Sequence, residues 1–392
     1  MQMRTQVAII GGGPAGLLLS EMLHQAGIDS VVIEQRTRAH VLGRIRAGVL
    51  EQGTVEVLRN AGLGKRLDRD GHLHDGAAIV WAGKKTYFID CWKFAGRRFT
   101  TYGQTNIQED LFAAADRRGA LVLDEAIDVL PKGLDTDHPW VTFSHNGASV
   151  RLDCDFVAGC DGYHGVSRSA IPSDRIRTFE KVYPFGWLGI LSETPPLDTL
   201  AYAHHPRGFA LASMRSPLLS RYYVQVPLED TVEDWSDERF WDELKRRYPQ
   251  DIADKIITGP SIEKSIAPLR SFVAEPMRYG RMYLAGDAAH IVPPTGAKGL
   301  NLAVSDVFYL SRALTHWYGD GSPAYLDNYS EMALRRVWSA VRFSWWLTNL
   351  LHRFPGMSDF DQRAQEVELD YLASSVHAQA SVAEQYAGIP FE

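Results

Sequence analysis

Four polar side chains in residues 209–226 could together bind a small organic anion. The segment, FALASMRSPLLSRYYVQV, is typical of two strands joined by a turn within residues 216–220. The polar side chains at alternating positions are Ser213, Arg215, Arg221 and Tyr223. If the turn is centred on Leu218, Ser213 lies opposite Tyr223. The same register places Arg215 opposite Arg221, and because side chains alternate along a strand, all four share one face.

Two guanidinium groups that face one another repel unless an anion lies between them. A carboxylate bound bidentately by Arg215 would supply that anion. The alternative interpretation is an exposed, hydrated arginine pair on the surface of a sheet. The hairpin pattern therefore predicts either a carboxylate site or a polar sheet surface.

A glycine-rich turn near the start of the chain predicts a second kind of binding. Residues 5–34 contain an apolar β-branched run, a glycine turn, a segment with helical periodicity and another apolar run. The G-x-G-x-x-G positions are Gly11, Gly13 and Gly16, and Glu34 follows the second strand. This pattern indicates a dinucleotide, because the N–H groups of a helix N-terminus bind phosphate and a carboxylate can accept hydrogen bonds from ribose. A strand-to-helix turn that merely favours glycine is the alternative.

Two later apolar strands each end in an aspartate. Residues 155–162 (DFVAGCDG) contain Asp161, and residues 282–290 (MYLAGDAAH) contain Asp287. Open α/β sheets bind ligands at the carboxyl ends of parallel strands, although either aspartate could instead cap a helix. A helix expected to begin near Gly299 would direct its positive end toward the same cleft.

The distribution of residue types predicts more than one domain, since 392 residues are many for one core. Residues 72–101 and 185–227 are rich in aromatic and β-branched residues, which favours an antiparallel sheet. We therefore expect an α/β fold with α+β elements: a discontinuous Rossmann-like nucleotide-binding domain, an inserted antiparallel-sheet substrate domain and C-terminal helices. The expected boundaries are 1–72, 100–180 and 268–318 for the first, 73–99 and 181–267 for the second, and 319–392 for the helices. Helices are also expected over 47–60 and from Gln104.

Composition argues against several classes of function. The net charge of −7 argues against a nucleic-acid partner. Cys91, Cys154 and Cys160 show neither disulfide nor metal-ligand spacing, so we expect no metal and three small buried side chains in a reducing cytoplasm. No signal peptide or membrane-spanning run is visible, which predicts a cytoplasmic protein with no membrane partner. Residues 338–351 predict an amphipathic helix used for packing or a subunit contact, with membrane association as the alternative.

The glycine turn, the internal Asp-Gly and the late GDAAH match, in order and spacing, the three motifs of the FAD-dependent aromatic hydroxylases. The chain resembles most closely the members of that family that act on 4-hydroxybenzoate. The segments that carry this resemblance are GRIRAGVLEQG (43–53), VYPFGWLG (182–189), HPRGFAL (205–211), RYYVQVPL (221–228), EDWSDERFW (233–241) and GDAAHIVPPTGAKGLNLA (286–303). The resemblance implies bound FAD, O₂ and transient NADPH or NADH, and 3-hydroxylation of 4-hydroxybenzoate to 3,4-dihydroxybenzoate by a flavin C4a-hydroperoxide. It also implies a homodimer.

The resemblance assigns roles by matching position. The residues implied to contact FAD are Gly11, Gly13, Gly16, Glu34, Arg46, Gln104, Asp161, Arg221, Asp287, Lys298, Gly299, Leu300 and Asn301. The residues implied to contact substrate are Ser213, Arg215 and Tyr223 at the carboxylate, and Tyr202 and the Pro294 carbonyl at the phenol oxygen. Tyr386 and His74 would carry the phenol proton outward, and an apolar wall would be formed by Val49, Trp187, Leu200 and Leu211. His290 is expected to be structural rather than catalytic.

The proposed proton path has a chemical reason. A neutral phenol is a poor nucleophile toward an electrophilic oxygen, and a phenol titrates only near pH ~10. A chain of hydroxyls that ends at a histidine can remove the proton near neutral pH. Nothing in the sequence by itself brings Tyr202, Tyr386 and His74 together, so this path is implied by the resemblance alone.

The segment after Glu34 departs from the family pattern, in which NADPH-preferring members carry Arg then Gln, and a Tyr where His40 stands. The candidates for contact with the nicotinamide cofactor are Arg36, Arg38, His40, Arg44, His164 and Arg270. A solvated charged face is the alternative for the arginine run. NADPH and NADH remain open, as do two other functions: a hydroxylase of another phenolic acid, or a non-catalytic binding protein on the same fold.

Overall fold

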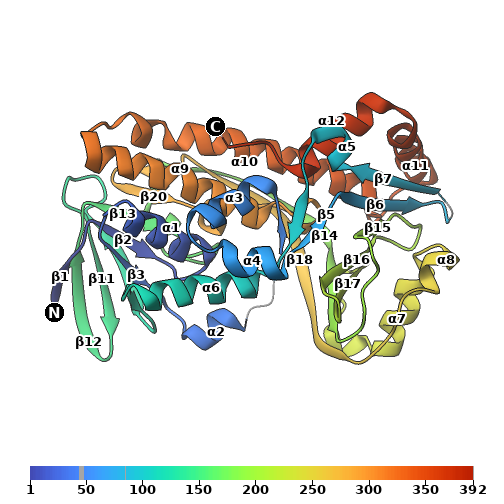
Figure 1. Cartoon of the computed structure of the whole chain (residues 1–392), viewed down its shortest axis with the longest axis horizontal. Helices are drawn as coiled ribbons and strands as arrows, with labels where there is room; N and C mark the ends of the chain where they lie inside the picture. Colours follow the sequence, from blue (N-terminus) through green and yellow to red (C-terminus); the bar gives the residue numbers. More distant parts are fainter. Residues whose placement is uncertain (44–47, 84, 392) are drawn as a thin grey trace.

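The computed structural model describes residues 1–43, 48–83 and 85–391. Two sheets dominate the molecule and lie at opposite ends of its long axis (Figure 1). One is a six-stranded, mostly parallel sheet flanked by helices, and the other is an eight-stranded sheet. This arrangement confirms the predicted combination of a Rossmann-like unit, a separate sheet and C-terminal helices.

The six-stranded sheet has the order β19-β20-β13-β2-β3-β9. Its strands are β2 (Val7–Ile10), β3 (Ser30–Ile33), β9 (Leu121–Leu123), β13 (Phe156–Gly159), β19 (Arg278–Tyr279) and β20 (Met282–Leu284). All neighbours pair in parallel except the edge pair β19–β20. Strands β2, β13 and β20 are buried along their whole length, as expected for parallel strands covered on both faces.

Helices cover this sheet and connect its strands. The long ones are α1 (Pro14–Gln25), α6 (Gln104–Arg117) and α9 (Gly299–Asp320), and the short ones are α2 (Arg38–Leu42), α3 (Gln52–Asn60) and α4 (Gly64–Asp70). The predicted starts at Gln104 and Gly299 are confirmed. The predicted helix over 47–60 is wrong at its start, because residues 49–50 form β4 (Val49–Leu50) and the helix begins only at Gln52.

The eight-stranded sheet has the order β21-β18-β14-β17-β16-β15-β6-β7. Its strands are β6 (Gly76–Trp81), β7 (Lys85–Asp90), β14 (Arg177–Ser192), β15 (Ala201–Ala203), β16 (Ala210–Ser216), β17 (Leu219–Val226), β18 (Ser261–Glu275) and β21 (His290–Ile291). The sheet is antiparallel except for the pair β15–β6. That pair joins segments more than a hundred residues apart, so no tight turn dictates its direction.

Smaller elements complete the fold. A three-stranded sheet contains β4, β8 (Phe99–Thr101) and β5 (His72–His74), and a four-stranded sheet contains β1 (Gln2–Arg4), β12 (Ala148–Asp153), β11 (Trp140–His145) and β10 (Ile127–Lys132). The remaining helices are α5 (Cys91–Ala95), α7 (Asp237–Arg246), α8 (Gln250–Ala253), α10 (Ala324–Leu351), α11 (Asp359–Ser374) and α12 (Val376–Ala387). Single 3₁₀ turns are η1 (Arg168–Ala170), η2 (Val232–Asp234), η3 (Gly286–Ala288) and η4 (Pro294–Gly296). In the described part of the chain, no helix is both long enough and apolar enough to cross a membrane.

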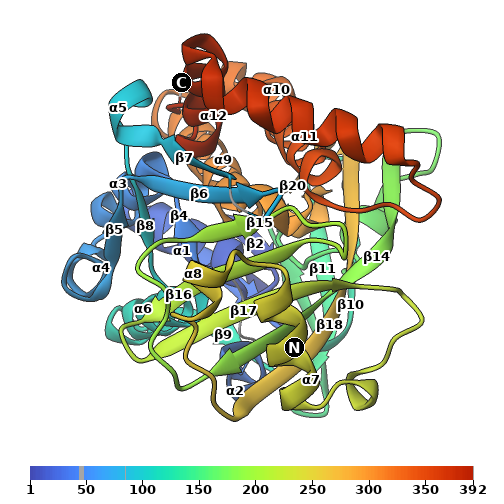
Figure 2. The same ribbon diagram turned by 90° about the vertical axis from the view of Figure 1, so that its right-hand side faces the viewer.

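The two faces of the eight-stranded sheet pack against different helices. Figure 2 shows α7 and α8 beside β16 and β17, and α10, α11 and α12 near β6 and β7. Tyr222 and Val224 belong to the apolar cluster that includes Trp241 of α7. Leu211 and Tyr223 belong to the cluster formed with α10 and α12. This alternation confirms the predicted faces of the hairpin.

The glycine turn gives a stability prediction. A Cβ at Gly16 would lie 1.9 Å from the carbonyl oxygen of Gly11, whereas a Cβ at Gly13 would meet nothing within 4 Å. We expect Gly16→Ala to lower the free energy of unfolding by roughly 1–3 kcal/mol, because α1 must move away from β2. Gly13→Ala should change it by less than about 0.5 kcal/mol. Urea unfolding of the two variants without added nucleotide checks this, and equal losses would contradict it.

Candidate functional site

The register of the β16–β17 hairpin differs from the predicted one by two residues. Ser213 pairs with Arg221, and Leu211 pairs with Tyr223. The predicted pairs Ser213–Tyr223 and Arg215–Arg221 are therefore wrong. Two features cause the shift: Ser216 pairs with Leu219, so the turn is centred between Pro217 and Leu218, and an irregularity between Met214 and Ser216 removes Arg215 from the ladder. A shift of two residues keeps every side chain on its predicted face, because the side-chain period of a strand is two.

A protein carboxylate, not a ligand, neutralises Arg221. Its Nη1 lies 2.9 Å from Oε1 of Glu263 on β18, and its Nε donates to the Tyr223 hydroxyl at 3.2 Å. Burial is the largest influence and lowers the pKa of Arg221, but Tyr223 and Glu263 outweigh it and the net pKa is raised. Sequence reasoning missed Glu263, because it lies on a strand distant in sequence.

Arg215 has no such partner. Its Nη1 donates to Ser213 Oγ at 3.0 Å and to the Met214 carbonyl at 3.2 Å, while its Nε is buried without a hydrogen bond. Among the described residues, no carboxylate lies within ion-pair distance of this guanidinium. Burial lowers the pKa of Arg215, and Tyr223 and Glu263 offset this only in part. An anionic ligand would relieve this unfavourable burial.

On the same face of the eight-stranded sheet, but farther from the arginines, two tyrosine hydroxyls meet. The hydroxyls of Tyr202 on β15 and Tyr386 on α12 are 2.8 Å apart. The Tyr202 hydroxyl also lies 3.1 Å from the carbonyl oxygen of Thr295. The neighbouring Pro294 carbonyl, which the resemblance implied for the phenol contact, accepts the Ala297 N–H at 2.9 Å. Burial raises the pKa values of both tyrosines, so both hydroxyls carry protons near neutral pH.

His74 does not touch this tyrosine pair. Its ring stacks on Phe99 with centroids 5.3 Å apart, and Phe99 in turn meets Tyr386 edge-on at 5.5 Å. His74 Nε2 lies 3.1 Å from Thr101 Oγ1, and burial lowers the pKa of His74. The structure thus joins two members of the implied proton path directly and places the third behind Phe99.

A row of residues links the tyrosine pair to the arginines across the sheet. Tyr202 pairs with Leu211, Leu211 with Tyr223, and Tyr223 with Gly189 of β14. Two strand spacings, about 10 Å, separate Tyr202 from Tyr223. A Cβ at Gly189 would lie 2.6 Å from the Tyr223 ring, so glycine is needed there to seat the tyrosine. Trp187, Leu200 and Leu211 belong to one buried cluster with Tyr202, and Val49 packs against it.

The glycine turn has the features of a phosphate site. Gly11 has φ 108°, and a Cβ there would lie 2.3 Å from the Cys160 carbonyl oxygen. Gly13 at the N-terminus of α1 is open to an approaching group. The Glu34 carboxylate accepts the N–H groups of Gly12 at 2.6 Å and Arg36 at 2.7 Å, which fixes it beside the turn with lone pairs to spare.

The two aspartate motifs lie at the carboxyl ends of β13 and β20, as predicted. Asp161 Oδ2 accepts the N–H and the hydroxyl of Ser167, at 2.9 and 3.0 Å, so Asp161 holds the following turn. Asp287 lies in η3. His290 Nε2 is 2.6 Å from Asp306 Oδ2, which also accepts the Gly286 N–H at 2.8 Å. This buried pair fixes the motif, consistent with the structural role expected for His290.

The start of α9 contains an ionic cluster that sequence reasoning missed. Lys298 Nζ donates to Glu51 Oε1 at 2.7 Å and to the Tyr386 carbonyl at 2.9 Å. Arg336 Nη2 lies 2.7 Å from the other Glu51 oxygen. Asn301 accepts the Glu51 N–H at 2.9 Å and donates to the Val49 carbonyl at 3.0 Å. Lys298 is thus paired with a carboxylate rather than free beside Gly299 and Leu300.

The nicotinamide candidates form two separate groups. Arg38 pairs with Asp116 at 2.7 Å, while Arg36 and His40 are exposed. His164 and Arg270 both pack on Tyr163, with a ring-centroid separation of 4.9 Å and a guanidinium-to-centroid distance of 4.7 Å. The tertiary structure thus brings His164 and Arg270 together. Gln104 is the first residue of α6, and Arg44 and Arg46 lie outside the described residues.

Comparison with known proteins agrees with this geometry. A family model described as "FAD binding domain" matches residues 4–344. A p-hydroxybenzoate hydroxylase from Acinetobacter baylyi is 54% identical over 392 residues, which are 100% of this chain and 96% of that protein. The chain belongs to the FAD-dependent aromatic hydroxylases. A rifampicin monooxygenase from Streptomyces venezuelae is 28% identical over 82% of this hydroxylase and 67% of its own length. The crystal structure of p-nitrophenol 4-monooxygenase from Pseudomonas putida shares the fold, with a TM-score of 0.81 and 20% identity over 99% of each chain.

The ionic cluster gives a stability prediction for this hydroxylase. Glu51→Gln would leave Lys298 and Arg336 buried without their shared carboxylate, since these side chains are only 5% and 11% exposed. We expect the free energy of unfolding to fall by roughly 3 kcal/mol. Glu331→Gln, at a glutamate that is 74% exposed, is the matched control and should cost less than about 1 kcal/mol. Similar losses in the two urea titrations would contradict the role of the cluster.

Proposed function

We propose that this chain hydroxylates 4-hydroxybenzoate at C3 to give 3,4-dihydroxybenzoate, with FAD as bound cofactor, O₂ as oxidant and NAD(P)H as reductant. The observation that carries the proposal is Arg215, a part-buried guanidinium whose Nε is buried without a hydrogen bond and which has no carboxylate within ion-pair distance among the described residues. The Tyr202–Tyr386 hydroxyl pair lies on the same sheet face, about two strand spacings from Tyr223. This separation suits a benzoate with its hydroxyl para to the carboxylate. The 54% identical relative, named p-hydroxybenzoate hydroxylase, supports the same substrate.

The residues of this chain fit FAD, because the open position at Gly13, the fixed Glu34 carboxylate and the N-terminus of α9 each suit one part of a dinucleotide. The residues proposed to hold it are Gly11, Gly13, Gly16, Glu34, Arg46, Gln104, Asp161, Arg221, Asp287, Lys298, Gly299, Leu300 and Asn301. When bound and reduced, FAD supplies the activation of O₂ for transfer of one oxygen atom to the aromatic ring. The residues proposed to meet NAD(P)H are Arg36, Arg38, His40, Arg44, His164 and Arg270.

In the proposed mechanism, the chain binds the ring at both ends and removes a proton. Arg215 holds the carboxylate with Ser213 and Tyr223. Tyr202 accepts a hydrogen bond from the phenol or takes its proton as its own proton passes to Tyr386, so that the ring becomes an electron-rich phenolate. Tyr386 would take the proton next, and His74 would carry it outward through a relay past the Phe99 ring that separates the two. The carbonyl groups at Pro294 and Thr295 would be acceptors beside this path. The apolar wall around Trp187 excludes water from the ring.

We also propose the domain boundaries given by the sequence: 1–72, 100–180 and 268–318 for the FAD-binding domain, 73–99 and 181–267 for the substrate domain, and 319–392 for the C-terminal helices. The C-terminal helices expose large apolar side chains, among them Phe360 at 80% and Tyr371 at 52%. These side chains support a homodimer that uses this region as its contact. The three buried, unpaired cysteines support a cytoplasmic location.

The proposed activity is tested by adding 4-hydroxybenzoate to the purified holoenzyme. We expect the protein to retain FAD, and NADPH or NADH oxidation to be stimulated and matched by 3,4-dihydroxybenzoate. Isomeric and dihydroxylated benzoates test the second candidate, a hydroxylase of another phenolic acid. The amide 4-hydroxybenzamide, which lacks the charge, should bind wild type much more weakly. Arg215→Ala should lose roughly 2–5 kcal/mol of binding free energy for 4-hydroxybenzoate, with FAD retained.

Three outcomes would contradict this proposal. A protein that does not take up FAD, or one stimulated more strongly by another benzoate, would refute the named reaction. Equal loss of FAD and of 4-hydroxybenzoate affinity in Arg215→Ala would mean that the guanidinium does not bind the carboxylate. Arg215→Lys should also be impaired, because an ammonium group cannot reproduce bidentate binding.

The Tyr202 hydroxyl gives a prediction about coupling. Tyr202→Phe removes the group that receives the phenol proton, so we expect hydroxylation to slow by roughly 100-fold or more while substrate still binds. Most NAD(P)H oxidation should then release hydrogen peroxide. The control is Tyr222→Phe, since Tyr222 faces the opposite side of the sheet, toward α7. Unchanged product yield per NAD(P)H in Tyr202→Phe would refute the role of this hydroxyl.

A further inference from the structure

His352 is a fully buried histidine that neither the resemblance nor the proposed reaction uses. It follows the last residue of α10 and is 0% exposed. Its ring stacks on Phe185 with centroids 4.8 Å apart and on Phe209 with centroids 4.3 Å apart. A polar ring buried in an aromatic cluster costs free energy unless its nitrogen atoms are hydrogen-bonded.

Both ring nitrogens have partners, and these partners define one tautomer. The indole Nε1 of Trp187 lies 2.7 Å from His352 Nε2, and the Thr348 carbonyl lies 3.0 Å from Nδ1. An indole N–H can only donate, so Nε2 must be the unprotonated acceptor. Nδ1 therefore carries the proton and donates it to Thr348. Burial lowers the pKa of His352 to about 3, in agreement with a neutral ring.

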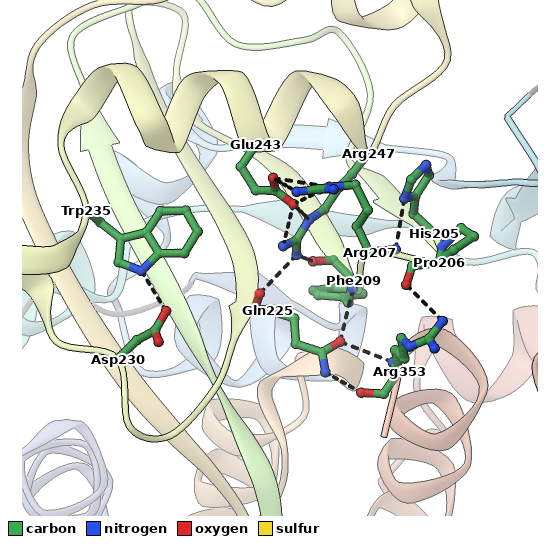
Figure 3. Close-up of polar contacts among 10 residues, drawn as sticks. All are labelled: His205, Pro206, Arg207, Phe209, Gln225, Asp230, Trp235, Glu243, Arg247 and Arg353. Carbon is green, nitrogen blue, oxygen red and sulfur yellow. Dashed lines mark hydrogen bonds and ion pairs between the residues drawn. The ribbon is translucent and has the colours of Figure 1, made fainter. Parts of the chain in front are cut away.

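The main chain that follows this ring is fixed to the substrate hairpin. The Gln225 side chain accepts the N–H groups of Phe209 and Arg353, each at 3.1 Å, and donates to the Arg353 carbonyl at 2.5 Å. Figure 3 shows the Gln225 side chain bonded to both Phe209 and Arg353, and Arg247 bonded to Phe209. Arg247 donates to the Phe209 carbonyl at 2.6 Å and pairs with Glu243 at 3.0 Å. His352 is consequently held rigidly next to the hairpin.

Trp187 connects His352 to the proposed substrate site. Its ring centroid lies 5.1 Å from that of Tyr223 and 4.7 Å from that of Phe209. Phe209 in turn lies 6.1 Å from Tyr202. The layer that Trp187 and Phe209 form therefore contacts a residue at each end of that site. The last turn of α10 reaches the same place, since Thr348 Oγ1 lies 2.9 Å from Thr295 Oγ1 and the Thr295 carbonyl contacts Tyr202.

We propose that His352 is a positioning residue that fixes the indole plane of Trp187 and so sets the aromatic wall against which the substrate ring lies. The inference rests on the proposed function. Without the Nε2 acceptor, the Trp187 N–H is buried without a partner and the indole turns to find one. The wall then no longer holds the ring between the carboxylate and phenol contacts.

The experiment compares two substitutions of His352 in the holoenzyme. His352→Leu removes the acceptor, whereas the His352→Gln side chain can present an amide oxygen to the indole N–H. We expect His352→Leu to raise the Kd for 4-hydroxybenzoate roughly tenfold and to lower product formed per NAD(P)H, with FAD content unchanged. His352→Gln should stay within about threefold of wild type on both measures. The Kd is followed by the change in flavin absorbance on titration with 4-hydroxybenzoate.

A double-mutant cycle tests whether His352 acts through Trp187. Trp187→Phe should reproduce the effects of His352→Leu, and His352→Leu should add nothing in the Trp187→Phe background. Trp241→Phe is the matched control, since it removes a buried indole bond of 2.9 Å to the Gly259 carbonyl on the other face of the sheet. It should leave Kd and coupling unchanged.

Three results would overturn the proposal: equal impairment in His352→Gln and His352→Leu, multiplicative effects of His352→Leu and Trp187→Phe, or coupling unchanged in Trp187→Phe. If His352→Leu does not fold, His352→Gln and Trp187→Phe decide the question alone. A wild-type holoenzyme that does not hydroxylate 4-hydroxybenzoate would refute the proposed function instead. The wild-type measurement therefore tests the proposed function, and the variants test the positioning role of His352.

Discussion

A guanidinium group that is removed from water needs an anion, and the proposed site of this hydroxylase depends on how the buried Arg221 and the part-buried Arg215 meet that requirement. Glu263 neutralises Arg221 within the protein. Arg215 donates to the Ser213 hydroxyl and the Met214 carbonyl, neither of which supplies negative charge, and among the described residues no carboxylate forms an ion pair with it. Because of this asymmetry, Arg215 rather than Arg221 is available for a ligand carboxylate.

The rest of the molecule holds a second group at a fixed distance from that charge. The row Tyr202, Leu211, Tyr223 and Gly189 crosses four adjacent strands, so the hydrogen bonds of the sheet set the separation of the two ends. The Tyr202 hydroxyl is hydrogen-bonded to the hydroxyl of Tyr386 from α12. The main-chain carbonyl of Tyr386 is in turn bound by Lys298, whose partner Glu51 also binds Arg336 of α10. The C-terminal helices are thus structurally part of the proposed site.

The aromatic layer beside the proposed site also depends on α10, because His352 follows the last residue of that helix. Trp187, Phe209 and His352 lie in near-parallel planes, and His352 is attached to Thr348 through one ring nitrogen and to Trp187 through the other. A hydrogen-bonded histidine restricts rotation of an indole far more than an aliphatic side chain would. Apolar surroundings of fixed shape are also what a reaction sensitive to water requires.

The sequence by itself determined the elements whose contacts are local. The strand-turn-helix-strand unit of residues 5–34 follows from glycines and apolar runs that contact one another within that segment. The sheet faces of β16 and β17 were also predictable, because a side chain keeps its face even when the register shifts by two residues. The same local patterns predicted that Asp161 and Asp287 follow the carboxyl ends of parallel strands. They also predicted where α9 begins.

Only the tertiary structure decided which partners these side chains have. The irregularity at Arg215, the Glu263 counter-ion, the Thr295 carbonyl at Tyr202 and the Phe99 ring between His74 and Tyr386 were not visible in the sequence. The cluster of Glu51, Lys298 and Arg336 was hidden for the same reason, as Lys298 and Glu51 are 247 positions apart. Hydropathy and spacing report the surroundings of a residue within one element. The charge that neutralises a buried arginine comes from whichever strand the fold places beside it, and that choice depends on the packing of the whole chain.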